Sequence, residues 1–193
     1  MRRRWIAVVL ASPASAMAHT GTGLAGGFVA GFVHPFTGFD HLLAMVSVGL
    51  WGAFLGRPLI YTLPVVFPMV MVAGAVLGMF GVPLPSVEMG IALSVAVLGT
   101  CIALALRTPV WMAAIIVGAF AIFHGYAHGR ELPSAADPAG YSSGFVLATG
   151  LLHVLGIGIG CLNQWRRGVV LTRGAGAAIG AVGLWFMYRA FGS

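Results

Sequence analysis

Charge is scarce in this sequence. Only 7% of its 193 residues are charged and four of them are acidic, whereas 60% are hydrophobic. The mean hydropathy is +1.00. A soluble domain of this size needs far more polar surface to face water. The composition therefore excludes a soluble protein and indicates an integral membrane protein.

Lysine is absent. All ten basic residues are arginine, and three of them, Arg2, Arg3 and Arg4, stand together at the start of the chain. The formal net charge of +6 halves when this cluster is set aside. Nucleic-acid-binding modules carry a cationic face on a soluble fold, which this composition does not provide. We therefore expect the arginines to set membrane topology, and we expect the lipid bilayer rather than nucleic acid as a partner.

Cysteine is also scarce. Cys101 and Cys161 both lie in apolar segments and lack CxxC spacing. They are expected to be packing residues rather than parts of a disulfide or a thiolate metal site. The phosphate-binding pattern Gly-x4-Gly-Lys-Ser/Thr is missing as well. The chain therefore has no motif of its own for using ATP.

Residues 1–18 have the layout of a secretory signal peptide. The arginine cluster is followed by an apolar run over residues 5–11 and by the small-residue ending Ala16-Met17-Ala18. This run is too short to cross a bilayer, so we expect cleavage after Ala18. Cleavage would make His19 the first residue of a single transmembrane domain over residues 19–193.

Six apolar segments follow, each close to the roughly 20 residues that cross the hydrocarbon core of a bilayer. They lie at 38–56, 59–80, 87–106, 109–128, 141–162 and 169–190. We therefore predict an all-α membrane protein, a six-transmembrane-helix bundle after a cleavable N-terminal signal peptide.

The remaining arginines predict the orientation of this bundle in the bacterial inner membrane. If the mature N-terminus is periplasmic, five arginines fall on the cytoplasmic side and two on the outside: Arg57, Arg107, Arg166, Arg167 and Arg173 against Arg130 and Arg189. This bias agrees with the positive-inside rule. Both ends of the mature chain are therefore expected in the periplasm.

Polar groups gather at the start of the first apolar segment. Pro35 and Gly38 disfavour a continuous helix there, so His34 and the pair Asp40-His41 are expected on two sides of a bend. Irregular backbone at membrane depth is tolerated where it is buried in protein or lines a cavity. Broken helices of this kind often mark ion sites in transporters.

A second polar group closes the fourth apolar segment. His124 and His128 are four residues apart and Glu131 follows three residues later, so one helical stripe presents all three side chains. On the predicted topology this stripe emerges on the same side as Asp40. Four histidines and two carboxylates are then expected at one depth, with His153 deeper in the membrane.

Each of these residues also has an ordinary explanation when taken singly. Asp40 would serve as a helix N-cap, Glu131 as a partner of Arg130, and His153 as a buried imidazole bonded to a backbone carbonyl. Glu88 suits the start of a helix without being a ligand. The joint arrangement favours a site, because six such groups at one membrane face are not expected by accident.

Imidazole nitrogens and carboxylate oxygens suit borderline divalent cations such as Ni²⁺ and Co²⁺. A site that also releases its ion needs incomplete or flexible coordination. We therefore expect the metal to be a transported substrate, with no permanently bound cofactor and no catalytic residues. The candidate metal-binding residues are His34, Asp40, His41, His124, His128, Glu131 and His153.

Three motifs carry these residues. They are His34-Pro-x-x-Gly-x-Asp40-His41-x-x-x-Met45, Phe123-His124-Gly-x-Ala-His128-Gly-x-Glu131, and Ala148-Thr149-Gly-x-x-His153-x-x-Gly156. Together they resemble the HupE/UreJ family of bacterial nickel and cobalt permeases. The resemblance implies secondary uptake of nickel or cobalt across the inner membrane, for metalloenzymes such as hydrogenase or urease.

Two other functions compete with this interpretation. His41, His124 and His128 with Asp40 also match an intramembrane zinc hydrolase of the ceramidase-like type, although the chain has no HExxH motif. A b-type haem protein with two axial histidines is a further alternative. The sequence does not rank nickel above cobalt, or membrane potential above proton exchange as the driving force, and it gives no indication of the oligomeric state.

Overall fold

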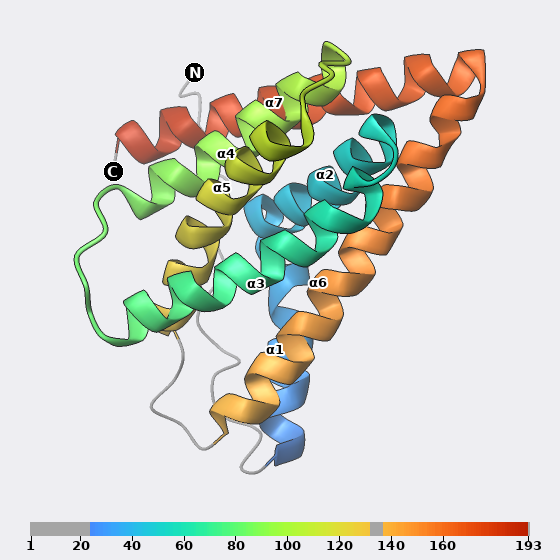
Figure 1. Ribbon diagram of the computed structural model, residues 1–193. Coiled ribbons are helices and arrows are strands. Elements are labelled where there is room, and N and C mark those ends of the chain that lie inside the picture. Colours follow the sequence, from blue (N-terminus) through green and yellow to red (C-terminus); the bar gives the residue numbers. More distant parts are fainter. Residues whose placement is uncertain (1–23, 132–136, 193) are drawn as a thin grey trace, which may run out of the picture.

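The computed structural model describes residues 24–131 and 137–192 (Figure 1). No strand occurs among these residues, so the all-α prediction is confirmed. The predicted signal peptide and His19 lie outside the described residues. The helices are α1 (Leu24–Thr37), α2 (Phe39–Leu55), α3 (Leu59–Met79), α4 (Val87–Ala103), α5 (Val110–Glu131), α6 (Pro138–Gly160), the short 3-10 helix η1 (Cys161–Gln164) and α7 (Arg166–Phe191).

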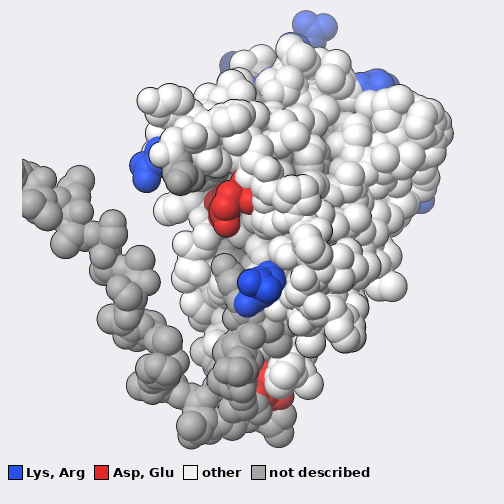
Figure 2. Space-filling model, turned by 90° about the vertical axis from the view of Figure 1, so that its left-hand side faces the viewer, with Lys and Arg blue, Asp and Glu red and all other residues white. Residues whose placement is uncertain are grey.

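The helices are long and apolar enough for a protein that crosses the membrane several times. By length and composition, α3, α5, α6 and α7 each suffice to span a bilayer, and the bent pair α1 and α2 makes a fifth span if it counts as one. Helix α4 is apolar but shorter, with 17 residues. Most of the surface seen in Figure 2 carries no charge, as expected for contact with lipid.

The six predicted apolar segments correspond to α2 through α7, mostly within three residues at each end. The prediction of 59–80, for example, compares with Leu59–Met79 for α3. Helix α4 spans about 25 Å at 1.5 Å per residue, which is less than the roughly 30 Å of a hydrocarbon core. The count of six membrane-crossing helices depends on α4 and stays a prediction.

The bend predicted near Pro35 and Gly38 is present. Helix α1 ends at Thr37, and its continuation α2 is turned by 83°. Gly38 stands between them with extended backbone, at φ −95° and ψ 109°. A Cβ added at Gly38 would lie 3.1 Å from Oδ1 of Asp40 and 3.2 Å from Nδ1 of His41, so glycine leaves room for both side chains.

Helices far apart in sequence form the main packing pairs. The most extensive contacts join α3 to α5, α4 to α7, and α6 to both α1 and α2. In Figure 1, α1 lies beside the N-terminal part of α6, and α4 lies beside α7. Cys101 contributes to the hydrophobic core, as expected of a packing residue.

One glycine fixes the helix that carries the second histidine motif. Gly125 follows His124 in α5, and its backbone lies directly against the carbonyl group of Met71 in α3. A Cβ at this position would overlap that carbonyl. The close approach of α3 and α5 therefore depends on glycine at 125 and sets the position of the neighbouring imidazoles.

Candidate functional site

The structure brings together the four histidines of the first two motifs. The ring of His128 lies with its centroid 4.9 Å from His34 and 4.6 Å from His41. His41 in turn lies 4.9 Å from His124. The four imidazoles therefore form one continuous row, which we call the histidine row, running His34, His128, His41 and His124.

The histidine row is assembled from three helices. Helix α1 supplies His34, α2 supplies His41, and α5 supplies His124 and His128 one turn apart. His124 is fully buried and His128 is 4% exposed, whereas His34 and His41 are partly exposed. The bend between α1 and α2 thus places two accessible imidazoles against two buried ones.

Asp40 holds the imidazole of His41 in one tautomer. Its Oδ1 lies 2.8 Å from Nδ1 of His41 and also accepts the backbone N–H of that residue. An ionised carboxylate only accepts hydrogen bonds, so Nδ1 of His41 carries the proton. The other ring nitrogen, Nε2, is buried and has no hydrogen-bond partner among the residues that the structure describes. His41 therefore presents a bare lone pair inside the protein.

Ser94 of α4 holds the imidazole of His124 in one tautomer. Its hydroxyl lies 2.6 Å from the carbonyl oxygen of Ile91, to which it donates its one proton. The Ser94 oxygen also lies 2.9 Å from Nε2 of His124 and must accept there. Nε2 of His124 is therefore protonated. Its buried Nδ1, which has no hydrogen-bond partner in the described part of the chain, keeps its lone pair.

His153 lies apart from the histidine row, behind an aromatic ring. The fully buried Phe67 of α3 has its ring 5.6 Å from His124 and also 5.6 Å from His153. His153 is 1% exposed, and its ring lies within reach of the Pro64 carbonyl in α3, although no hydrogen bond of full geometric quality joins its ring nitrogens to another described residue. The expected ordinary role, a buried imidazole bonded to a backbone carbonyl, therefore stays open beside that of a metal ligand.

The carbonyl that approaches the His153 ring belongs to Pro64 in α3. Pro68 follows one turn later and has no N–H to donate to the Pro64 carbonyl. That carbonyl therefore lacks its helical partner. Helix α3 offers polar backbone beside His153 at a depth where the rest of its surface is apolar.

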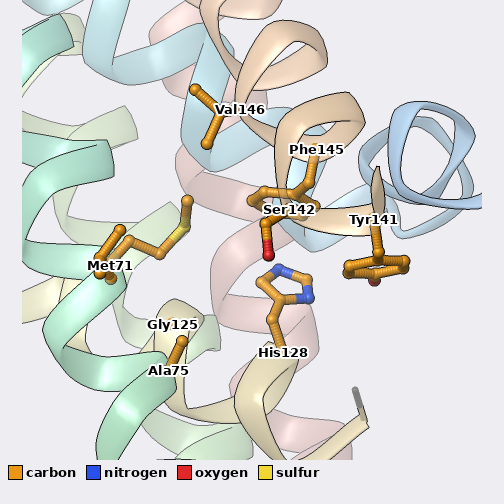
Figure 3. A pocket seen from close by; sticks show the side chains of 9 residues that line it. Met71, Ala75, Gly125, His128, Tyr141, Ser142, Phe145 and Val146 are labelled. Carbon is orange, nitrogen blue, oxygen red and sulfur yellow. The ribbon is translucent and has the colours of Figure 1, made fainter. Parts of the chain in front are cut away.

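A small cavity of about 60 Å³ reaches the histidine row from the side, between α3, α5 and α6. Figure 3 shows the His128 imidazole at this cavity, close to the hydroxyl of Ser142 and beside the ring of Tyr141. The Phe145 ring lies 4.3 Å from that of His128. The cavity is large enough for a water molecule and is otherwise apolar.

The donor atoms are not yet arranged around a common point. Among the described residues, no group of three or more His, Cys, Asp or Glu side chains is placed to hold a metal ion. Neighbouring rings of the histidine row are inclined at 60° to 83° instead. Glu131 ends α5, and its side chain is outside the described part of the chain. Side-chain rotation is needed before several ligands can meet.

Three residues of this region were not singled out from the sequence: Ser94, Phe67 and Tyr141. Ser94 and His124 are 30 positions apart and belong to different helices. No motif links them, so only the packing of α4 against α5 shows the contact. The one available sequence signal was that Ser94 is polar in an apolar segment.

The family model and the known protein that match this chain agree with each other. A family model described as HupE / UreJ protein matches residues 6–186. Protein HupE of Rhizobium leguminosarum bv. viciae is 48% identical over 174 residues, which cover 90% of this chain and 91% of that protein. No solved structure matches the chain.

Proposed function

The chain belongs to the HupE/UreJ family, and from that premise we propose that it is a secondary permease for Ni²⁺ or Co²⁺ in the bacterial inner membrane. The family is one of transporters, so the chain has a role related to nickel or cobalt transport and is not an enzyme. The zinc-hydrolase alternative is therefore rejected. The imported metal would supply metalloenzymes such as hydrogenase or urease.

The observation that carries the proposal is the pair of bare lone pairs in the histidine row. Nε2 of His41 and Nδ1 of His124 lie on neighbouring rings and are buried, and neither has a hydrogen-bond partner within residues 24–131 and 137–192. Neutral imidazole is a good ligand for Ni²⁺ and Co²⁺. Partners on the far ring nitrogen, here Asp40 and Ser94, orient such ligands in metal sites.

The partly exposed histidines give an ion its first contacts. His34 and His41 would take it from the outer side, and small rotations of the rings would pass it to His124 and His128. A site with loosely arranged ligands suits a transporter, because an ion that is held too well is not released. The absence of a ready-made three-ligand group among the described side chains is consistent with this requirement.

The proposed route inward passes Phe67, whose ring lies 5.6 Å from the rings of both His124 and His153. His153 lies 15 residues into α6, about 22 Å along that helix from its outer end at 1.5 Å per residue. An ion there would meet the imidazole and the Pro64 carbonyl. The membrane potential favours passage of a dication across the whole membrane by about 4.6 kcal/mol at 100 mV, and the movement as far as His153 by a fraction of that. Exchange for protons at the histidines is the other possible driving force.

Radiolabelled nickel uptake, with cobalt as competitor, tests the proposal in metal-starved bacteria that express the wild type or His41→Ala at matched membrane levels. Ser143→Ala is a suitable control, because Ser143 is exposed on α6 and does not line the cavity beside His128. We expect saturable uptake in the wild type and the control, and at least a tenfold lower rate in His41→Ala. Wild-type cells that accumulate neither metal above background would refute the permease.

A further inference from the structure

An acidic cavity of about 390 Å³ opens beside the histidine row. Asp40 of α2, Glu88 at the start of α4 and Arg189 near the end of α7 all line it. We call it the vestibule. Asp40 is also the carboxylate that holds His41, so the vestibule borders the histidine row at His41. In Figure 2, acidic atoms lie near the middle of the face viewed, with basic atoms on either side.

Arg189 is an unusual residue for this position. It is one of only two arginines that the predicted topology places outside, where basic residues are few. Its guanidinium group lies 5.4 Å from the centre of the Trp185 ring, a cation–π arrangement that holds it near the cavity. The chain has four acidic residues, and two of them share this one cavity with Arg189.

Helix-end electrostatics account for part of this arrangement. A glutamate at the start of α4 and an arginine in the last turn of α7 each suit their own helix end. They do not account for the placement of both charges, together with Asp40, around one cavity. A cation that enters the vestibule meets two carboxylates and must compete with the positive charge of Arg189.

We propose that Arg189 is the resident counter-ion of the vestibule and limits how tightly the vestibule holds the metal. In the empty protein its positive charge offsets Asp40 and Glu88. A dication is attracted by the carboxylates and repelled by Arg189 twice as strongly as a monovalent ion, so the offset acts most on the transported metal. Arg189 thus keeps the metal from being retained at the entrance and favours its passage to the histidine row. This inference rests on the proposed transport function.

Charge substitutions at Arg189 test the idea. A cavity of this volume is about 9 Å across, and a unit charge at that distance from a dication in water changes binding by about fivefold. We expect Arg189→Gln to lower KM for nickel uptake three- to fivefold at about 0.01 M ionic strength, and less than twofold near 0.15 M. Arg189→Glu should lower KM by about tenfold. Arg189→Lys should resemble the wild type.

Arg57→Gln is the matched control. Arg57 also lies over an aromatic ring, that of Tyr61 at 5.6 Å, but it lies in the connection between α2 and α3 and does not line the vestibule. Its KM should not change. The charge-reversal and lysine variants keep the test valid if Arg189→Gln does not reach the membrane. Equal KM values across the Arg189 series, or an equal change in Arg57→Gln, would overturn the proposal.

Nickel binding to the purified variants separates this proposal from transport itself. If the wild type takes up no metal, but Arg189→Gln binds nickel more tightly than Arg189→Lys, the vestibule is supported and the permease is refuted. If the wild type transports normally while neither KM nor binding follows the charge at 189, the permease stands and the role of Arg189 is refuted.

Discussion

Replacing Ser94 with alanine tests whether the tautomer of His124 matters for transport. Ser94 is fully buried, and among the described residues its hydroxyl is the only hydrogen-bond partner of the His124 ring. Alanine leaves the Nε2–H of His124 buried without an acceptor, at a cost of about 1–3 kcal/mol. The ring then gains by turning or by moving its proton, and either change removes the lone pair from the histidine row.

The size of the effect follows from the role of such partners in metal sites. Removing a group that orients a metal ligand typically lowers affinity by about 10- to 100-fold. We expect Ser94→Ala to reduce nickel uptake efficiency, measured as the ratio of maximal rate to KM, by about that factor. Nitrogen NMR of histidine-labelled protein should show His124 leaving its Nε2–H form in the same variant.

Ser47→Ala is the control for this experiment. Ser47 is also fully buried, but its hydroxyl has no hydrogen-bond partner among the described residues. Its removal should leave uptake unchanged. Ser94→Thr retains a hydroxyl and should recover much of the activity. Wild-type uptake in Ser94→Ala, or an equal loss in Ser47→Ala, would show that the hydrogen bond to His124 plays no specific part.

Three further substitutions probe the rest of the route. Asp40→Asn replaces an obligate acceptor with an amide that can also donate to His41, so metal binding by the purified protein should weaken about tenfold in equilibrium dialysis; unchanged binding would contradict the tautomer argument. His153→Ala should leave metal binding by the purified protein within about twofold of the wild type, because the histidine row is intact. Metal uptake should fall by more than tenfold, because only the passage beyond the histidine row is lost. A parallel loss of binding and uptake would place His153 in the outer site. Gly125→Ala forces a Cβ onto the Met71 carbonyl, and this overpacking should cost about 1–3 kcal/mol of stability. Thermal unfolding of the purified protein should show a lower melting temperature, and the membrane level should fall. An unchanged melting temperature would mean that α3 and α5 can move apart at this contact without loss of stability.

Local features of the site were predictable because they depend on short stretches of sequence. The spacing of His124 and His128 fixes them on one helical face, and the helix breaks at Gly38, before Asp40, whereas Pro35 is accommodated inside α1. Apolar length gave the helices themselves. These signals involve residues within a turn or two of each other, where backbone geometry alone decides the outcome.

Contacts between helices were not predictable from one sequence. The role of Ser94 depends on α4 packing against α5, and that of Phe67 on α3 lying between α5 and α6. Hydrophobic patterns that are apolar on all sides do not reveal which helices are neighbours. The number of membrane crossings was also not predictable, because the 17 residues of α4 are near the lower limit of what spans a bilayer.

The bend at Gly38 links two members of the histidine row to the angle between α1 and α2. His34 and His41 lie on opposite arms of the 83° turn, with ring centres 6.4 Å apart. An ion held by both rings would favour one angle between α1 and α2. By thermodynamic reciprocity, any force that opens or closes this angle changes the affinity for the ion by the same free energy. A change in bilayer tension or thickness that alters this angle would then change the affinity of the protein for the ion.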